Sequence, residues 1–443
     1  MCFVRSDGGI SVSDRKFFAA LIAALALFAA PAFAETTLIY AGTVLVKPGE
    51  RPLKEQTIVV TDGKIAEIKA GYIAPADGQT VIDLKDKFVL PGLIDTHVHL
   101  LQELGPDDKL HRVETSDPGF ALDGAYNAML NLKAGFTTVA DMGETVGGEA
   151  IFALRNAIRD GKIPGPRILA AGSIISPTGG HGQVYGYRAV VMDIFHSSGV
   201  CDGVDDCRRA VRLQVSRSAD FIKFVATGGV LSDTKAGLGQ QFTDEEMKAI
   251  VDTAHTFGRK VFAHAHGVDG INAALRAGVD GIEHGTYLDE TSIRLFRQHN
   301  AWLTPTVIAG ITVGEYAKTG DFMSPAVAEK ALKVGPIIQD ALRRAHAGGV
   351  KISFGTDTGV GRHGTNGREF KLMVDAGFTP MEAIVAATLR AAEKLGIEGD
   401  AGTIEAGRAA DIIATAKSPL DDITELERVV FVMRGGVVYK QPD

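Results

Sequence analysis

The feature that most constrains the fold of this chain is a series of short apolar segments that each end in a side chain able to bind a metal ion. Each segment is followed by glycine, a loop or a helical pattern. An apolar strand that presents one polar group at its C-terminal end is the way in which (β/α) barrels build their functional sites. The side chains in question are those of His97, His99, Lys223, His264, His284 and Asp357.

Strand-like and helix-like patterns alternate through the middle of the chain. Such an alternation is typical of α/β proteins with parallel strands. We therefore expect a (β/α)8 TIM-like barrel over residues 91–398. The candidate strands are 88–95, 137–141, 167–171, 220–227, 260–266, 281–284, 302–307 and 351–357.

The two flanking segments, 35–90 and 399–443, differ from the middle of the chain because both consist of strand patterns alone. Apolar and polar residues alternate in them and are interrupted by glycine-containing turns. This pattern is typical of antiparallel sheets. The simplest arrangement brings the two ends together, so we expect a small β-sandwich built from both termini.

The first residues have the pattern of a targeting segment. Arg15 and Lys16 precede an apolar stretch, and an A-x-A cleavage pattern ends at Ala34. Such a segment is a secretory signal peptide, and its apolar part is too short to span a bilayer. We therefore predict a signal peptide over 1–34 and a mature protein that begins at Glu35. This protein would be periplasmic or secreted from a bacterial cell, with no stable membrane anchor after cleavage.

The overall charge argues against nucleic acid as a partner. The formal net charge is −8 and the sequence pI is about 5.9. No stripe of lysine and arginine is present to neutralise a phosphate backbone, which is the main source of affinity for nucleic acids.

Two cysteines remain after the predicted cleavage, Cys201 and Cys207, and they flank a short turn rich in aspartate and glycine. In an oxidising compartment, an even and closely spaced pair favours a local disulfide. Two free thiols are the alternative. Metal binding by this pair is disfavoured because no nearby histidine completes a site.

The histidines fall into groups that a strand would orient together. Residues i and i+2 of a strand face the same way, so His97 and His99 form half of a metal site. His264 and His266 also share a face, and we expect only one of them to be a ligand. His284 ends the next apolar run.

Lys223 is the least expected of the polar side chains, because both faces of its strand are apolar. An unpaired buried lysine is costly, and such lysines shift their pKa or are used chemically. A lysine that extends its ammonium to solvent is one interpretation. The other is a lysine that adds CO2 to become a carbamate, which replaces a charge of +1 by −1 and bridges two cations. Asp357 is the carboxylate placed to act as both metal ligand and proton acceptor, and the donor set suits Zn²⁺.

These motifs together resemble the amidohydrolase superfamily over essentially the whole mature chain. The matching pieces are PGLIDTHVHL, the strand-four lysine, HAHG, IEHG, GTD and GTIEAGRAADIIA. The most similar branch has imidazolonepropionase-like domains and includes Xaa-Pro and Xaa-Arg dipeptidases and bacterial ochratoxin amidohydrolases. The resemblance implies two divalent metal ions, one held by His97, His99, Lys223 and Asp357, and the other by carbamylated Lys223, His264 and His284.

The resemblance implies hydrolysis of the amide bond to a C-terminal amino acid, in dipeptides or N-acyl amino acids, with ochratoxin A among the substrates. Asp357 would move the proton, and His266 would donate to the developing oxyanion. A lactamase or esterase with the same metal centre is the alternative. A metal carrier without turnover is disfavoured, since storage requires neither a carbamate nor a proton shuttle.

The loops after strands would select the substrate. The loop at 176–188 contains His181, Tyr187 and Arg188, and the segment after the last strand contains Arg362 and His363. An arginine or several donors would suit a substrate carboxylate. Each of these residues is otherwise a solvated loop residue, and we favour a function for His181 and His363. The expected partner is a small-molecule or dipeptide substrate. The sequence leaves open whether the chain forms a homo-oligomer.

Overall fold

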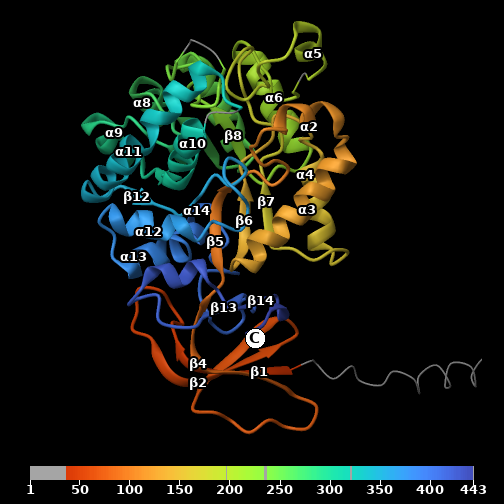
Figure 1. Ribbon diagram of the computed structural model, residues 1–443, viewed down its shortest axis with the longest axis vertical. Coiled ribbons are helices and arrows are strands. Elements are labelled where there is room, and N and C mark those ends of the chain that lie inside the picture. Colours follow the sequence, from red (N-terminus) through yellow and green to blue (C-terminus); the bar gives the residue numbers. More distant parts are fainter. Residues whose placement is uncertain (1–35, 196, 234–236, 320–321, 443) are drawn as a thin grey trace, which may run out of the picture.

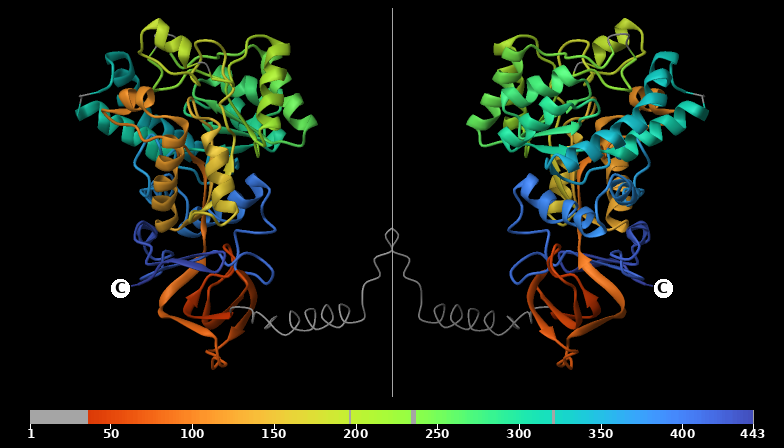
Figure 2. Two further views of the ribbon diagram at one scale, coloured as in Figure 1. Left: turned by 90° about the vertical axis from the view of Figure 1, so that its right-hand side faces the viewer. Right: turned by 90° about the vertical axis from the view of Figure 1, so that its left-hand side faces the viewer.

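The computed structural model describes residues 36–195, 197–233, 237–319 and 322–442. The predicted signal peptide at 1–34 lies outside these residues. A strand-rich unit lies at one end of the molecule, and the helices surround the strands of the larger unit (Figures 1 and 2). In the described part of the chain, no helix is both long and apolar enough to cross a lipid bilayer.

The larger unit contains two parallel sheets of three and five strands. The first sheet has β5 (Leu93–Val98), β6 (Phe136–Asp141) and β7 (Arg167–Ala170). The second has β8 (Ile222–Val225), β9 (Val261–Ala265), β10 (Gly281–His284), β11 (Trp302–Thr304) and β12 (Lys351–Ile352). This is the strand order expected for a TIM-barrel-like α/β fold.

Backbone contacts link the two sheets at both of their boundaries. On one side Ile175 N donates to Lys223 O at 2.9 Å. On the other side, Thr96 N donates to Phe354 O at 3.1 Å and an isolated bridge joins Val98 to Thr358. Regular strand pairing is interrupted at these two boundaries, where β7 and β12 are only four and two residues long. The fold is therefore barrel-like, and a single closed sheet of eight strands stays a prediction.

Helices connect successive strands, as the alternation predicted. A capping box begins α7, because the Thr243 side chain accepts from Glu246 N and the Glu246 side chain accepts from Thr243 N. The helices are α2 (Asp108–Glu114), α3 (Asp117–Lys133), α4 (Ala150–Arg159), α5 (Ala189–Ile194), α6 (Val204–Ser216), α7 (Asp244–Thr256), α8 (Val268–Ala277), α9 (Glu290–His299), α10 (Val307–Thr319), α11 (Pro325–Ala347), α12 (Arg368–Asp375), α13 (Pro380–Ala386) and α14 (Leu389–Leu395).

The two ends of the chain do combine, in one seven-stranded sheet with the order β15-β14-β13-β4-β1-β2-β3. β4 pairs with β1 in parallel and with β13 in antiparallel orientation, so the C-terminal strands extend the N-terminal sheet. A sandwich of two sheets stays a prediction. The strands are β1 (Thr36–Val44), β2 (Leu53–Thr61), β3 (Lys64–Ala70), β4 (Thr80–Pro91), β13 (Ile412–Thr415), β14 (Phe431–Arg434) and β15 (Val437–Lys440).

The expected strand 88–95 is in fact divided between the two units. Residues up to Pro91 belong to β4 of the seven-stranded sheet, and β5 begins at Leu93. The chain crosses at Gly92, where a Cβ atom would lie 2.1 Å from Thr137 Oγ1. The apolar run in the sequence gave no sign of this crossing, because the last residues of β4 and all of β5 are buried.

Candidate metal centre

The first group of possible ligands combines two histidines with one carboxylate. His97 and His99 come from the end of β5, and Asp357 comes from the loop after β12. Asp357 Oδ1 lies 3.4 Å from His97 Nε2 and 3.3 Å from His99 Nε2. All three side chains are buried, so their donor atoms converge away from bulk solvent.

The second group contains three histidines, the two predicted ligands and the predicted donor to the oxyanion. His264 and His266 on and beside β9 lie with His284 of β10 so that one nitrogen from each falls within 4.8 Å of the others. The rings of His264 and His266 are 4.7 Å apart, and those of His266 and His284 are stacked at 4.9 Å. The structure thus brings both members of the His264 and His266 pair to the site.

The two groups adjoin, because the rings of His97 and His284 are 5.1 Å apart. His284 and Asp357 have positive φ values of 72° and 59°, which residues other than glycine rarely adopt. Such strained backbone concentrates at functional sites. Adjacent residues of a strand normally face opposite sides. At the end of β10, however, both Glu283 and His284 reach His97, and the positive φ value at His284 is consistent with this departure.

Four of the histidine rings are each oriented by a hydrogen bond at the Nδ1 atom. The partner fixes the ring and leaves Nε2 facing the other ligands, as in many protein metal sites. The Nδ1 partners are Glu283 Oε2 for His97 at 2.8 Å, Gly143 O for His99 at 2.6 Å, Thr306 Oγ1 for His284 at 2.7 Å and Thr286 Oγ1 for His266 at 2.7 Å.

The donor atoms fit a metal ion, because two buried nitrogens of this site lack any hydrogen-bond partner among the described residues. These are His97 Nε2 and His264 Nε2. An unsatisfied buried polar atom is costly, and a metal ion is one way to satisfy it. Burial also lowers the pKa of His264 well below its usual range, so its imidazole is in the neutral form that binds metals.

Lys223 lines the same cavity as the histidines, although its side chain makes no ion pair or hydrogen bond within the described part of the chain. The residue is 3% exposed. Burial lowers the pKa of its ammonium group to about 8. An amine that loses its proton this readily is more nucleophilic than an ordinary lysine.

A cavity of about 250 Å³ lies over these groups. His181 and Tyr187 line it, as predicted for substrate-contacting residues. The His181 ring lies 4.2 Å from that of His264, and its Nδ1 is 2.8 Å from Ser232 Oγ. Burial lowers the pKa of His181 to about 3, so it is neutral.

The other three predicted substrate residues do not line the cavity. Arg188 and Arg362 are exposed on the surface. His363 is buried, with Nε2 at 2.9 Å from Gln102 O and Nδ1 at 3.1 Å from Asn131 Nδ2. Its side chain is thus engaged in joining segments of the fold, and a role of these residues in substrate binding stays a prediction.

Arg112 lines the cavity but was not identified from the sequence. Its Nε donates to both oxygens of Asp108, Nη1 donates to Thr145 Oγ1 at 2.8 Å, and Nη2 donates to Gln102 Oε1 at 2.8 Å. The only available signal was its position shortly after the first barrel strand, where such loops surround the site.

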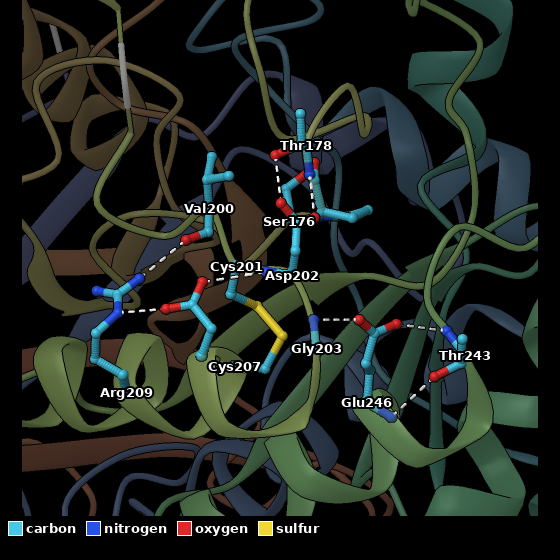
Figure 3. Close-up of a disulfide and its surroundings, with 12 residues drawn as sticks. Ser176, Thr178, Val200, Cys201, Asp202, Gly203, Cys207, Arg209, Thr243 and Glu246 are labelled. Atoms are coloured by element: carbon cyan, nitrogen blue, oxygen red, sulfur yellow. Dashed lines mark hydrogen bonds and ion pairs between the residues drawn. A yellow bond between two sulfur atoms is a disulfide. The ribbon is translucent and has the colours of Figure 1, made fainter.

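Cys201 and Cys207 form a disulfide at the start of α6 (Figure 3). Between them lies Asp202, whose carboxylate accepts from Thr178 N at 3.0 Å and from Thr178 Oγ1 at 2.6 Å. Cys201 N also donates to Ser176 O at 3.0 Å. The disulfide segment therefore holds the beginning of the loop that carries His181.

Removing this disulfide is expected to destabilise the protein moderately. A disulfide that closes so short a loop lowers the conformational entropy of the unfolded chain, which stabilises the folded protein by about 2 kcal/mol. The variant Cys201→Ser/Cys207→Ser should show a free energy of unfolding lower by this amount in urea titrations. Fully reduced wild-type protein should match the variant, and equal stability of oxidised wild type and variant would contradict the prediction.

Known proteins resemble this chain over nearly its whole length. The sequence model of the amidohydrolase family matches residues 88–439. An ochratoxinase of Aspergillus niger is 33% identical over 453 aligned positions, which cover 92% of this chain and 88% of that protein. A crystal structure of a Xaa-Pro dipeptidase with methionine bound in its active site is 40% identical, with a TM-score of 0.85 over 92% of this chain and 100% of that one. The crystal structure of A. niger ochratoxinase has a TM-score of 0.78 at 30% identity, over 92% and 96% of the two chains.

Proposed function

This chain belongs to the amidohydrolase family and is a hydrolase of amide bonds, and from this premise we propose that it releases a C-terminal amino acid from dipeptides or N-acyl amino acids. The similarity to a Xaa-Pro dipeptidase and to an ochratoxinase supports this substrate class. A Xaa-Pro dipeptide and ochratoxin A both contain an amide bond to an amino acid with a free carboxylate. We include ochratoxin A among the proposed substrates.

The observation that carries the proposal is the convergence of two ligand groups and one lysine without a partner at the base of a cavity. We propose a centre with two metal ions, both Zn²⁺, and a carbamate on Lys223. When bound, such ions activate water at neutral pH and polarise the carbonyl that is attacked. The residues that would hold them are His97, His99, Lys223 and Asp357 for one ion, and Lys223, His264 and His284 for the other.

The side chains around the centre would move the protons of the reaction. Asp357 accepts a proton from the attacking water and delivers it to the leaving amine. Burial lowers the pKa of His266 to about 4, so its ring is neutral. We assign the tautomer in which the Thr286 hydroxyl donates to Nδ1 and Nε2–H donates to the developing oxyanion.

The walls of the cavity differ in character, which suits an amide with one charged end. The helices α10 and α11 contribute apolar residues to the lining, and α2 contributes basic ones. The apolar residues include Val230, Val313, Val327, Val334 and Ile338, and the polar ones include Gln102, Lys109, Arg112, Thr145 and Tyr187. Of these, Arg112 is already held in place through three of its five N–H groups, which leaves two to bind a carboxylate. We propose that it binds the free carboxylate of the substrate.

Replacing Arg112 with methionine should raise KM for substrates that have a free C-terminus. Hydrogen bonds that involve charged groups contribute about 1.5–3 kcal/mol, so the loss in kcat/KM should be roughly tenfold to a hundredfold. The measurement compares one dipeptide with its C-terminal amide in wild type and variant. The matched variant Arg212→Met, at an exposed arginine of α6 that does not line the cavity, should leave kcat/KM unchanged. An equal loss for free and amidated substrates would remove the carboxylate role from Arg112.

We also propose that the protein is exported and processed at Ala34. The A-x-A pattern and the basic residues before the apolar stretch support this. Expression in a bacterial host with an export pathway, followed by N-terminal sequencing of the periplasmic product, should give Glu35 as the first residue. An intact N-terminus in the cytoplasm would contradict the proposal.

The decisive experiment for the function is the release of free amino acid by protein reconstituted with zinc and bicarbonate. The panel holds dipeptides, N-acyl amino acids and ochratoxin A, each with a free or an amidated C-terminus. Cleavage that requires the free C-terminus supports the proposal, and the preferred residue defines the specificity. No release from any member, with two metal ions bound, would refute the proposed substrates and favour a lactam or an ester.

A further inference from the structure

We propose that a buried ion pair, Glu283 with Lys394, positions His97 for metal binding, an inference that rests on the metal centre proposed above. Glu283 lies on β10 directly before His284, and Lys394 lies on α14. Both residues are 0% exposed. The pair is thus supplied by two segments that are far apart in the sequence and meet beneath the ligand groups.

The carboxylate of Glu283 bridges the two other side chains. Its Oε2 atom lies 2.8 Å from His97 Nδ1, and its Oε1 atom lies 2.8 Å from Lys394 Nζ. Each oxygen therefore has one strong partner. The carboxylate is positioned from one side by the lysine and in turn positions the imidazole on the other side.

Lys394 is fully engaged by this network. Besides Glu283, its ammonium donates to Thr96 Oγ1 at 3.2 Å and to Thr304 Oγ1, which uses all three of its hydrogens. The ammonium also lies 4.5 Å above the ring of Phe262. A charge buried to this extent is tolerated only when it is paired and hydrogen-bonded.

The consequence for His97 is a single tautomer. A carboxylate only accepts hydrogen bonds, so His97 Nδ1 must carry the hydrogen and Nε2 must present its lone pair. His97 Nε2 is one of the buried nitrogens that lack a partner among the described residues. The negative charge behind the ring also makes it a more basic ligand.

The neighbouring histidines are oriented by weaker means. His266 and His284 face threonine hydroxyls, which either donate or accept, and His99 faces a carbonyl group. Among these four oriented rings, His97 is the one whose orienting partner has a full charge. We therefore assign Glu283 and Lys394 as positioning residues of the metal site.

A purely structural ion pair is the competing explanation. Buried pairs are weak sources of stability, and replacing both members together is often neutral. That explanation predicts altered unfolding but unaltered metal affinity for any variant that folds. The two explanations are therefore separated by measuring the affinity of the folded protein for metal.

The test uses Glu283→Gln, which retains the shape of the side chain but removes its charge and can donate as well as accept. We expect the affinity for Zn²⁺, measured by competition with a chelator, to fall about tenfold to a hundredfold. The absorption spectrum of the Co²⁺-loaded protein should shift as well, since the ligand field at His97 changes. The control is Glu425→Gln, another buried glutamate, which should retain wild-type affinity.

The variant Glu283→Gln/Lys394→Met, which leaves no unpaired buried charge, carries the test if the single variant does not fold. Its affinity should be reduced to a similar extent. Affinity within about twofold of wild type in a folded variant would overturn the inference. Wild-type protein that binds fewer than two metal ions would instead refute the proposed centre, so the two failures are distinguishable.

Discussion

Asparagine in place of Asp357 is expected to lower kcat for amide hydrolysis by about 10³-fold while most of the metal stays bound. A positioned acid or base contributes about 10²- to 10⁴-fold to catalysis. The amide oxygen of asparagine still reaches the position that lies 3.3–3.4 Å from the nitrogens of His97 and His99. It cannot take up a proton, so the variant separates binding of the metal from transfer of the proton.

The measurement combines metal content by elemental analysis with kcat at saturating substrate. Asp411→Asn is the matched control, because Asp411 is also buried but pairs with Arg167 away from the cavity. The control should retain both metal and turnover. Full activity of Asp357→Asn would remove this residue from proton transfer, and loss of all metal would assign it to metal binding alone.

The order of the strands and the convergence of their C-terminal ends could be predicted from the sequence. Polar residues such as His97 and His284 stand at the ends of successive apolar runs, and parallel strands bring their C-terminal ends to the same edge of the sheet. The same reasoning placed His264 at the site as a ligand and His266 as a hydrogen-bond donor, but it did not give the distances of their rings from His284. The i, i+2 rule predicts that His264 and His266 share a face. The distances from their rings to that of His284 also depend on the backbone at His284, and no sequence pattern reveals its positive φ value.

The partners of the ligands were beyond prediction for a different reason. Glu283 was included only as part of the IEHG motif, and Lys394 was assigned no role from the sequence. They meet only because α14 packs under the strands, across a separation of 111 residues. Arg112 was missed for a similar reason, because its position is set by Asp108, Thr145 and Gln102 rather than by a local motif.

The loops were the least predictable part of the site. Arg188 and Arg362 have the chemistry that a carboxylate requires, and each follows a strand in the expected place. Both side chains are exposed, so the composition of a loop does not by itself determine whether its side chains point into the cavity. His181 differs because Gln241 and Ser232 fix its backbone and ring, with His181 N donating to Gln241 Oε1 at 2.9 Å.

Replacing Lys223 with methionine is expected to abolish activity, with a fall of more than about 10³-fold, and to weaken the binding of both metal ions. In our proposal the carbamate supplies the negative charge shared by the two ions, and methionine supplies none. Each tenfold loss in rate corresponds to about 1.4 kcal/mol of transition-state stabilisation, so this loss equals the several kcal/mol that metal activation provides.

Lys223→Glu is the matched variant, because it places a permanent carboxylate on the same strand. It should bind metal whether or not bicarbonate is present, whereas wild-type protein should require bicarbonate for full loading. The carbamate forms from the neutral amine, and burial lowers the pKa of Lys223 from 10.5 to about 8. At a fixed concentration of dissolved CO2, metal uptake by the wild-type apoprotein should therefore become faster as the pH rises through about 8. Metal uptake by Lys223→Met equal to that of wild type, at every bicarbonate concentration, would eliminate the carbamate and leave Lys223 as a buried lysine without a role in the centre.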